Sequence, residues 1–433
     1  MDLSSYGTFL NEKASQGLLE RQRRHSQRQR LRHIKYQEIA TLDTRSWMAK
    51  VPDETYLSAL TLPGTHDSAA YGSLWPFVST QTLTLTQQLD SGIRYMDLRC
   101  GLRADVLEMV HGRALLGRTL ASSFEDMYTW LSANPTEALT VQIKQDRAPE
   151  GSTIGFAEAM WRLIDASPSK WVLGGATPRL SQVRGRIQLL RRFAMSGRFR
   201  PAGIDVSRWQ DNPSQPFRIR TRAGTNIVIQ DHYNPSKPGP LPGVVAEKFD
   251  LVESMLDLAS EQPRSVLKSL RALFSSLSDA DHHLRTWYLN FCSAYQFNVL
   301  FQSFPYEIAV GAWSGYTWVD GVNRLLQRKL LEARGAKKRY GVVLLDFPEK
   351  PDPELVGQLI ATNFGPRCAA RRRGHVRISA KAVLALAITL FLIFIAGWII
   401  VFVHGPVDRS ICPPFLHACG SHIDDGNAIL AVG

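Results

Sequence analysis

The stretch GTHDSA, residues 64–69, follows an apolar run over residues 56–62 and sets an imidazole beside a carboxylate where that run gives way to a turn. In parallel α/β barrels the catalytic groups lie at this kind of junction, at the carboxyl end of a strand. Farther along, GIRYMDLR over residues 92–99 and then His111-Gly112 add an acid, a guanidinium and a second imidazole. Two histidines with an arginine suit phosphoryl chemistry.

Between about residues 46 and 364, apolar runs of strand length alternate with helix-like periodic stretches, which predicts a parallel α/β architecture. The 433 residues leave room for one barrel of about 250 residues with appendages. Strands are expected over residues 57–62, 93–99, 139–144, 187–192, 227–230, 287–291 and 342–345, with an eighth over 203–209. Residues 106–110 follow Arg99 too closely for a parallel crossover and are expected to form a hairpin arm. The fold class is therefore a single irregular TIM (β/α)8-type barrel.

Helices are expected where apolar residues recur at spacings of three and four. These segments are residues 120–133, 154–166, 244–260, 322–333 and 353–361. The strands between them repeatedly end in a charged or hydroxyl residue, which barrel packing alone does not require. The residues at these ends are His66, Arg99, Lys144, Arg192, Asp231, Ser293 and Asp346.

The net charge of +12 is concentrated in two segments rather than spread along the chain. Residues 1–45 form a basic arm, disordered or helical, which either has no specific partner or is attracted to anionic lipid. Nothing in the sequence supports a nucleic-acid partner. The second basic segment, residues 367–381, precedes an uncharged stretch over residues 382–403 and a short tail, residues 404–433.

The uncharged stretch 382–403 has the length of a transmembrane helix, the alternative being a buried core helix. Because the basic residues precede it, the positive-inside rule predicts a single-pass, C-terminally anchored protein with its catalytic domain in the cytoplasm. Three of the five cysteines would then lie on the reducing side, where a disulfide framework is not expected. Cys412 and Cys419 lie in the tail, and their pairing is left open.

Eight segments in order resemble the phosphatidylinositol-specific phospholipase C family in its bacterial-type form, a catalytic X-like region without calcium-dependent accessory domains. They are LPGTHDS (62–68), QLDSGIRYMDLR (88–99), His111-Gly112, NPTEALTVQIKQD (134–146), RGRIQLLRRF (184–193), IQDHY (229–233), YLNF (288–291) and VVLLDFP (342–348). The resemblance covers most of residues 46–366. It implies a barrel that cleaves inositol phospholipids, and we expect a monomer.

The resemblance also implies roles for single residues. His66 would be the general base, held by Asp346, and His111 the general acid, paired with Asp67. Arg99 would lie at the phosphate. Inositol contacts would fall to Lys144, Arg192 and Asp231, with Tyr233 stacking on the ring.

Acid–base chemistry at a phosphodiester needs one group to take a proton and another to give one, and imidazoles titrate in the useful range. Arg99 stands where a metal-bound charge would otherwise act, so no metal and no cofactor are expected. Cys100, where bacterial-type members usually have glycine, and Gln145-Asp146 after Lys144 depart from the pattern. The second departure makes inositol specificity less certain than the acid–base pair.

Purely structural interpretations of these residues remain open. The two histidines could be satisfied core residues, Arg99 and Asp346 a structural ion pair, and Lys144, Arg192 and Asp231 an ionic ring that never touches substrate. The aromatic stretch WSGYTW, residues 313–318, is either core packing or an anchor in lipid headgroups.

Two further functions compete with the phospholipase. One is a catalytically silent, inositol-lipid-binding membrane tether. The other is a metal-dependent glycerophosphodiester phosphodiesterase, which would require glutamates near the first histidine, and none occurs there.

Overall fold

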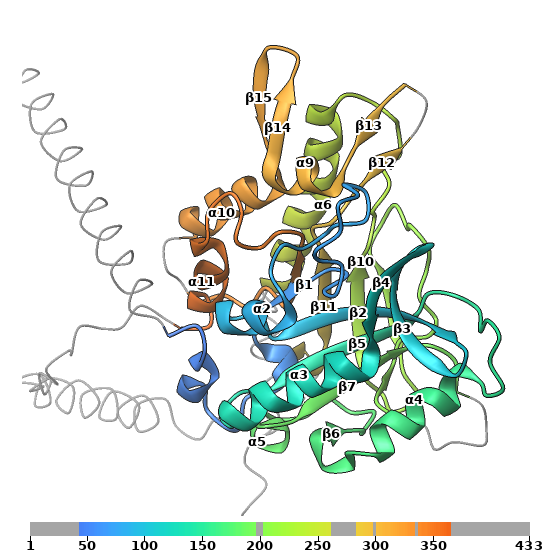
Figure 1. Cartoon of the computed structure of the whole chain (residues 1–433). Coiled ribbons are helices and arrows are strands. Elements are labelled where there is room, and N and C mark those ends of the chain that lie inside the picture. Colours follow the sequence, from blue (N-terminus) through green and yellow to red (C-terminus); the bar gives the residue numbers. More distant parts are fainter. Residues whose placement is uncertain (1–42, 196–201, 261–282, 298–299, 334–336, 365–433) are drawn as a thin grey trace, which may run out of the picture. The chain divides into compact units, whose positions relative to one another are not determined.

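The computed structural model describes residues 43–195, 202–260, 283–297, 300–333 and 337–364. In this part of the chain, eight parallel strands form an incomplete barrel (Figure 1). Taken around the barrel, they are β10 (Asn226–Gln230), β11 (Trp287–Phe291), β16 (Val342–Leu345), β1 (Leu62–Thr65), β2 (Tyr95–Arg103), β5 (Leu139–Gln145), β7 (Ile187–Arg192) and β8 (Ile204–Asp205). The predicted α/β barrel is confirmed.

The barrel is open between β8 and β10, where the described strands show no pairing. On one side β8 has only two residues, and β6 (Trp171–Val172) pairs with the start of β7. On the other side β9 (Phe217–Arg220) runs antiparallel to β10. The eighth strand is therefore shorter than the predicted 203–209. Gly203, just before it, has φ +71°, and a Cβ there would lie 2.5 Å from the Leu189 carbonyl oxygen.

The first strand begins later than predicted. Residues Leu57–Ala59 form a 3-10 turn, η2, and β1 starts at Leu62, where pairing with Val342 of β16 begins. The hairpin prediction is confirmed, because β3 (Val106–His111) pairs antiparallel with the end of β2 and then with β4 (Ala114–Thr119). Ala104 and Asp105 both have positive φ, as a tight turn of the primed type requires.

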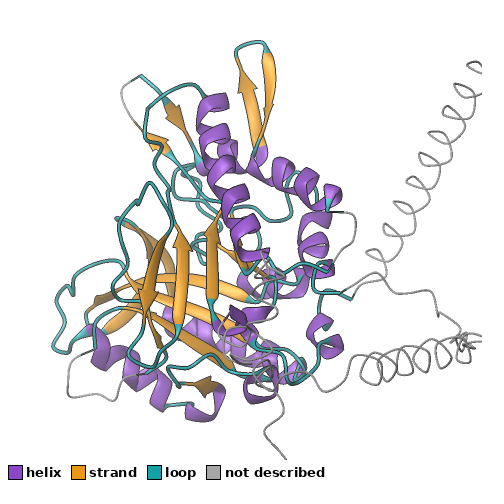
Figure 2. Ribbon diagram, turned by 180° about the vertical axis from the view of Figure 1, so that it is seen from behind, coloured by secondary structure: helices purple, strands orange, loops and turns teal. Residues whose placement is uncertain are grey.

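Helices cover the sheet (Figures 1 and 2), and the five predicted helical segments correspond to α3, α4, α6, α10 and α11. The α-helices are α2 (Leu85–Ser91), α3 (Leu120–Ala133), α4 (Phe156–Asp165), α5 (Leu180–Val183), α6 (Leu241–Ser260), α9 (Pro305–Val310), α10 (Val322–Glu332) and α11 (Glu354–Ala361); η1 (Trp47–Lys50) and η3 (Pro168–Lys170) are 3-10 turns. In α3 the buried residues Phe124, Met127 and Leu131 recur at the spacing of one helix face. Phe124 packs edge-on against Trp171 with ring centroids 4.9 Å apart.

Two hairpins, β12–β13 (Gln296–Phe297, Gln302–Ser303) and β14–β15 (Gly311–Ser314, Thr317–Asp320), project from the same end of the molecule in both views (Figures 1 and 2). They lie in the connection from β11 to α10, which leaves the carboxyl end of β11. In a barrel of this type that end carries the functional site.

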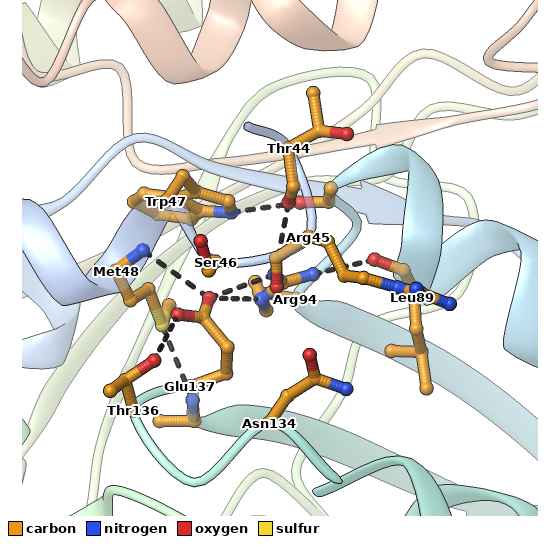
Figure 3. Close-up of polar contacts among 12 residues, drawn as sticks. Thr44, Arg45, Ser46, Trp47, Met48, Leu89, Arg94, Asn134, Thr136 and Glu137 are labelled. Carbon is orange, nitrogen blue, oxygen red and sulfur yellow. Dashed lines mark hydrogen bonds and ion pairs between the residues drawn. The ribbon is translucent and has the colours of Figure 1, made fainter. Parts of the chain in front are cut away.

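The amino end of β2 is tied to the N-terminal segment by a buried arginine (Figure 3). Arg94 and Glu137 are both fully buried, and Arg94 Nε and Nη2 lie 2.9 and 2.8 Å from Glu137 Oε2. The same guanidinium donates to the carbonyl oxygens of Thr44, Arg45, Leu89 and Ile93. Each charge of this pair therefore has hydrogen-bonded partners, which a buried ion pair needs.

Candidate active site

The first imidazole of the site is placed by strand register. Thr65 of β1 pairs with Leu345 of β16, so the next residues, His66 and Asp346, leave neighbouring parallel strands side by side. His66 Nδ1 lies 2.9 Å from Asp346 Oδ1. When Asp346 is ionised, its carboxylate accepts from Nδ1–H, and Nε2 is then left as a proton acceptor.

The side chain of His66 is 12% exposed and that of Asp346 is 1% exposed. Burial lowers the pKa of His66 well below its ordinary value, and the positive charge of Arg99 lowers it further. A general base must be neutral before it can accept a proton, so this direction favours the role that the resemblance implies. Burial also raises the pKa of Asp346, with the charge of Asp67 adding to that effect.

The second imidazole reaches the site from the β3–β4 hairpin. His111 Nδ1 donates to the carbonyl oxygen of Val78 at 2.7 Å, and Nε2 lies 3.5 Å from Asp67 Oδ2. Asp67 is fully buried, has φ +45°, and neither of its carboxylate oxygens has a hydrogen-bond partner among the described residues. Residues held in this conformation recur at functional sites, although a positive φ also occurs in ordinary turns such as Ala104-Asp105.

Arg99 lies between two buried carboxylates. Its Nη1 is 3.4 Å from Asp67 Oδ2, and its Nε and Nη2 are 3.2 and 3.1 Å from Asp97 Oδ2. Burial opposes the charged form, but Asp67 and Asp97 outweigh it and raise the pKa of Arg99. The guanidinium is therefore a fixed positive charge. The structural pairing of Arg99 with Asp346 that the sequence left open is not observed.

Asp97 supports this arrangement and had not been singled out as a site residue. It accepts a hydrogen bond from Gln142 Nε2 at 2.7 Å, and Gln142 Oε1 accepts one from Tyr95 OH at 2.9 Å. The signal was present in the sequence, because residues two apart on a strand face the same side, and Asp97 is two residues before Arg99.

The residues expected to contact inositol fall into two separate pairs. Lys144 Nζ pairs with Asp146 Oδ1, and Arg192 Nη2 lies 3.9 Å from Asp231 Oδ2. No described contact joins Lys144 to Asp231, so the ionic ring that was left open as the alternative interpretation is not observed. Burial lowers the pKa of Lys144 and raises that of Asp231.

Trp209 orders the second pair and was missed as a site residue. Its Nε1 donates to Asp231 Oδ2 at 2.8 Å, and its ring lies 4.0 Å from the Arg192 guanidinium carbon. Tyr233 lies at the edge of the group, where its hydroxyl donates to Asp211 Oδ1 at 2.7 Å. Its ring stacks on Tyr295 with centroids 5.8 Å apart, so this ring is already partnered on one face.

Several buried polar atoms at the strand ends have no hydrogen-bond partner among the described residues. They are both carboxylate oxygens of Asp67, Asp346 Oδ2, Arg192 Nη1 and Ser293 Oγ. Buried polar atoms are nearly always satisfied in folded proteins, so each of these atoms requires an explanation, and a bound ligand or water is one. Carboxylates, a guanidinium and a hydroxyl together match a ligand with both hydroxyl and phosphate groups.

In the described residues, no group of three His, Cys, Asp or Glu side chains has the arrangement of a metal site. The aromatic stretch 313–318 forms the β14–β15 hairpin, where Trp313, Tyr316 and Trp318 are 69%, 101% and 50% exposed. Core packing was therefore the wrong interpretation of this stretch. The two thiols that the structure describes, Cys100 and Cys292, are buried and unpaired.

Comparison with known proteins finds similar sequences and a similar fold. The family model described as PI-PLC X matches residues 53–158, which hold both histidines and Arg99. This part of the chain is therefore similar to a PI-PLC X domain. A 1-phosphatidylinositol phosphodiesterase of Listeria monocytogenes is 28% identical over 329 residues, covering 72% of this chain and 83% of that protein. Its counterpart from Staphylococcus aureus (strain Newman) is 29% identical, covering 43% of this chain and 64% of that protein.

Two solved structures have a fold similar to that of this chain. The phosphatidylinositol-specific phospholipase C of Listeria monocytogenes superposes with a TM-score of 0.53 at 25% identity, covering 74% of this chain and 99% of that one. A variant of the Staphylococcus aureus enzyme gives a TM-score of 0.58 at 21% identity, covering 74% and 98%. These two bacterial structures are thus similar to this chain over 74% of its length.

The predicted localisation, a cytoplasmic catalytic domain held by a C-terminal membrane helix, is corrected. Among the described residues, no helix combines the length and apolar character needed to cross a bilayer. The phosphodiesterase of Listeria monocytogenes matches 72% of this chain, so the similarity does not extend over its whole length. The predicted span 382–403 and the basic segments 1–45 and 367–381 lie almost entirely outside the described residues.

Proposed function

We propose that this chain is a phosphatidylinositol-specific phosphodiesterase of the phospholipase C type. The observation that carries the proposal is the pairing of His66 with Asp346 at 2.9 Å, on the same rim as Arg99 and His111. The relatives named 1-phosphatidylinositol phosphodiesterase support the substrate class.

In the proposed reaction His66 Nε2 removes the proton from the inositol 2-hydroxyl, and that oxygen attacks phosphorus. Arg99 neutralises the charge that builds on the phosphate oxygens. His111 gives its proton to the diacylglycerol oxygen as the phosphorus–oxygen bond breaks. The products are diacylglycerol and a cyclic inositol phosphate. His66 then releases its proton to solvent and His111 takes one up, which restores the starting state.

His111 has to turn for this step. In the substrate-free site its Nδ1 is held by the Val78 carbonyl and its Nε2 faces Asp67. One ring nitrogen must be released to reach the leaving oxygen, and the other must keep a partner that fixes the ring. A turn that places Nδ1 against Asp67 leaves Nε2 free, and this is the arrangement that we assign to the substrate complex.

The test is product formation by the purified full chain in the presence of EDTA. We expect cyclic inositol phosphate from phosphatidylinositol at an unchanged rate, because Arg99 supplies the charge that a metal would otherwise supply. Turnover that EDTA abolishes would point to the metal-dependent phosphodiesterase. A folded chain without turnover would point to the silent lipid-binding tether. The assay is ³¹P NMR, which separates cyclic from acyclic phosphate.

We further propose that the β14–β15 hairpin contacts the lipid surface. Its exposed aromatics lie in the β11–α10 connection, on the end of the barrel that holds the site. Leu74, Trp75 and Phe77, also exposed, lie in the connection that follows β1 and leave the barrel at the same end. Amphipathic rings at the headgroup level are a common anchor for proteins that act on membranes.

Replacing Trp313 and Trp318 by alanine should therefore lower activity on phosphatidylinositol vesicles by about tenfold, the equivalent of about 1.4 kcal/mol of binding. Activity on a water-soluble inositol phosphodiester should stay near the wild-type value. Leu331→Ala, which removes an exposed apolar residue from α10, serves as the matched control. Equal losses on both substrates would reject the anchor.

A further inference from the structure

The turn that carries His111 lies beyond the sheet. Among the described strands, β3 pairs with β2 as far as Met109, which lies opposite Cys100, and His111 follows two residues later. At the tip of the hairpin His111 pairs with Ala114 of β4, across a turn in which Gly112 has φ +56°. A two-stranded hairpin is marginally stable by itself, so the position of the imidazole depends on what else holds this tip.

Three polar contacts join the tip to other elements in the part of the chain that the structure describes. Two of them involve the His111 ring, whose Nδ1 donates to the Val78 carbonyl at 2.7 Å and whose Nε2 lies 3.5 Å from Asp67 Oδ2. The third is made by the backbone, because the Gly112 amide donates to Asp146 Oδ2 at 3.2 Å. The proposed reaction requires the ring to leave Val78, whereas the Gly112 contact does not depend on how the ring is turned.

Asp146 reaches this tip from a strand that does not pair with the hairpin. Its own amide donates to the Cys100 carbonyl at 2.9 Å, just after β5, and β2 lies between β5 and β3. Its side chain is 10% exposed, and its two oxygens have different partners, since Oδ1 pairs with Lys144 Nζ and Oδ2 accepts from Gly112. One carboxylate therefore joins an expected inositol ligand to the turn that carries the expected general acid.

The acceptor of this hydrogen bond is charged at neutral pH. Burial would raise the pKa of Asp146, but the positive charges of Lys144 and Arg99 outweigh that effect and lower the pKa below its ordinary value. A backbone amide that donates to an ionised carboxylate makes a stronger hydrogen bond than one that donates to a neutral group. Lys144 thus keeps Asp146 in the form that holds Gly112 most firmly.

We propose that Asp146 is a positioning residue for the general acid, which fixes the turn carrying His111 through the Gly112 amide while the imidazole leaves Val78 and turns toward the leaving oxygen. Asp146 itself touches no reacting atom in this assignment. The proposal rests on the proposed function, because it needs His111 to protonate the leaving group.

The leaving group of the substrate provides the test. Diacylglycerol leaves as an alcohol and needs a proton, whereas the nitrophenolate of a nitrophenyl inositol phosphate leaves without one, so a poorly placed general acid should slow only the first substrate. In Asp146→Ala we expect kcat for a short-chain phosphatidylinositol, dispersed as monomers, to fall by about tenfold or more. The kcat for the nitrophenyl substrate should stay within about twofold of the wild-type value.

Two further variants separate the turn from Lys144. Lys144→Met removes the cation but leaves the contact between Asp146 and Gly112, so it should change the KM of both substrates alike and keep the wild-type ratio of their kcat values. The double variant D146A/K144M should lose this ratio to the same extent as Asp146→Ala. A double variant with the wild-type ratio would trace the loss to an unpaired Lys144 and would overturn the proposal.

Glu150→Ala is the matched control. Glu150 lies in the same connection after β5, and its carboxylate is 3.7 Å from Arg147 Nη2. Its backbone bonds to Leu102 and Ala104, at the other end of the hairpin, so this variant should leave both kcat values unchanged. An equal fall of both kcat values in Asp146→Ala would contradict the proposal. A wild-type chain without turnover on either substrate would instead defeat the proposed function.

Amide hydrogen exchange tests the contact without turnover. In the wild-type full chain we expect the Gly112 amide to exchange at least about tenfold more slowly than a free amide, and in Asp146→Ala we expect this protection to be lost. A Gly112 amide that exchanges as fast as a free amide in the wild type would overturn the proposal, whether or not the variant folds.

Discussion

His66→Ala lowers kcat/KM for phosphatidylinositol cleavage by roughly 10²- to 10⁴-fold, the contribution of a positioned general base. The variant removes the imidazole whose Nδ1 lies 2.9 Å from Asp346 Oδ1. The Nε2 of the same ring is the atom that accepts the proton in the proposed reaction. The acid limb of the wild-type profile should disappear with it. In the wild type that limb should lie below pH 6.5, because burial and Arg99 lower the pKa of His66, and activity is lost as the pH falls through that pKa.

The matched control is His283→Gln. His283 precedes β11 at the amino end of the barrel, where its ring packs against Tyr288 with centroids 5.9 Å apart. This variant should keep wild-type kcat/KM and the same acid limb. A loss of less than about tenfold in His66→Ala, measured on folded protein, would remove His66 from the role of base.

Much of the site could be predicted because strand ends converge in a parallel barrel. Eight strands are expected from the sequence, and those over residues 139–144, 187–192 and 287–291 agree with β5, β7 and β11 to within one residue. Reading each apolar run to its polar end then brings His66, Arg99 and Asp346 to the same rim without any knowledge of their contacts.

The features that the sequence could not predict depend on partners distant in the chain. The apolar run 57–62 looks like a strand, but only its last residue pairs with β16, because the ladder begins at Val342. Trp209 gains its role from Asp231, which lies 22 residues farther along the chain and after a different strand. Short apolar runs are ambiguous for this reason.

Arg94→Met should lower the free energy of unfolding by about 3–5 kcal/mol, the cost of leaving one member of a buried pair without its partner. Both side chains of the pair are fully buried. The substitution also removes the hydrogen bonds that the guanidinium donates to four backbone carbonyls. The guanidinium carbon lies 4.6 Å from the Trp130 ring, so the methionine keeps part of the packing but none of the charge. Urea unfolding would show a lower midpoint with an unchanged m-value.

A nearby surface pair gives the comparison that isolates burial. Arg45 also contacts an acid, Asp90 at 2.8 Å, but its side chain is 58% exposed. Water and salt replace such a contact, so Arg45→Ala should leave the midpoint unchanged within error. Arg94→Met combined with Glu137→Gln should lose less than Arg94→Met alone, because no unpaired charge remains buried. A midpoint for Arg94→Met equal to that of Arg45→Ala would show that the Thr44–Arg45 segment is not held by Arg94.

The activity of Arg94→Met tests whether the two ends of the barrel have separate roles. Arg94 precedes Tyr95, the first residue of β2, while Asp97 and Arg99 lie farther along the same strand and face the reaction. At a temperature where Arg94→Met is fully folded, kcat should match the wild type, because the pair lies at the end of the strand opposite the acid–base groups. A stable fold with lost activity would instead mean that the amino end of β2 sets the position of Arg99. The usual division of a barrel, with stability at the amino ends of the strands and catalysis at the carboxyl ends, would then not hold here.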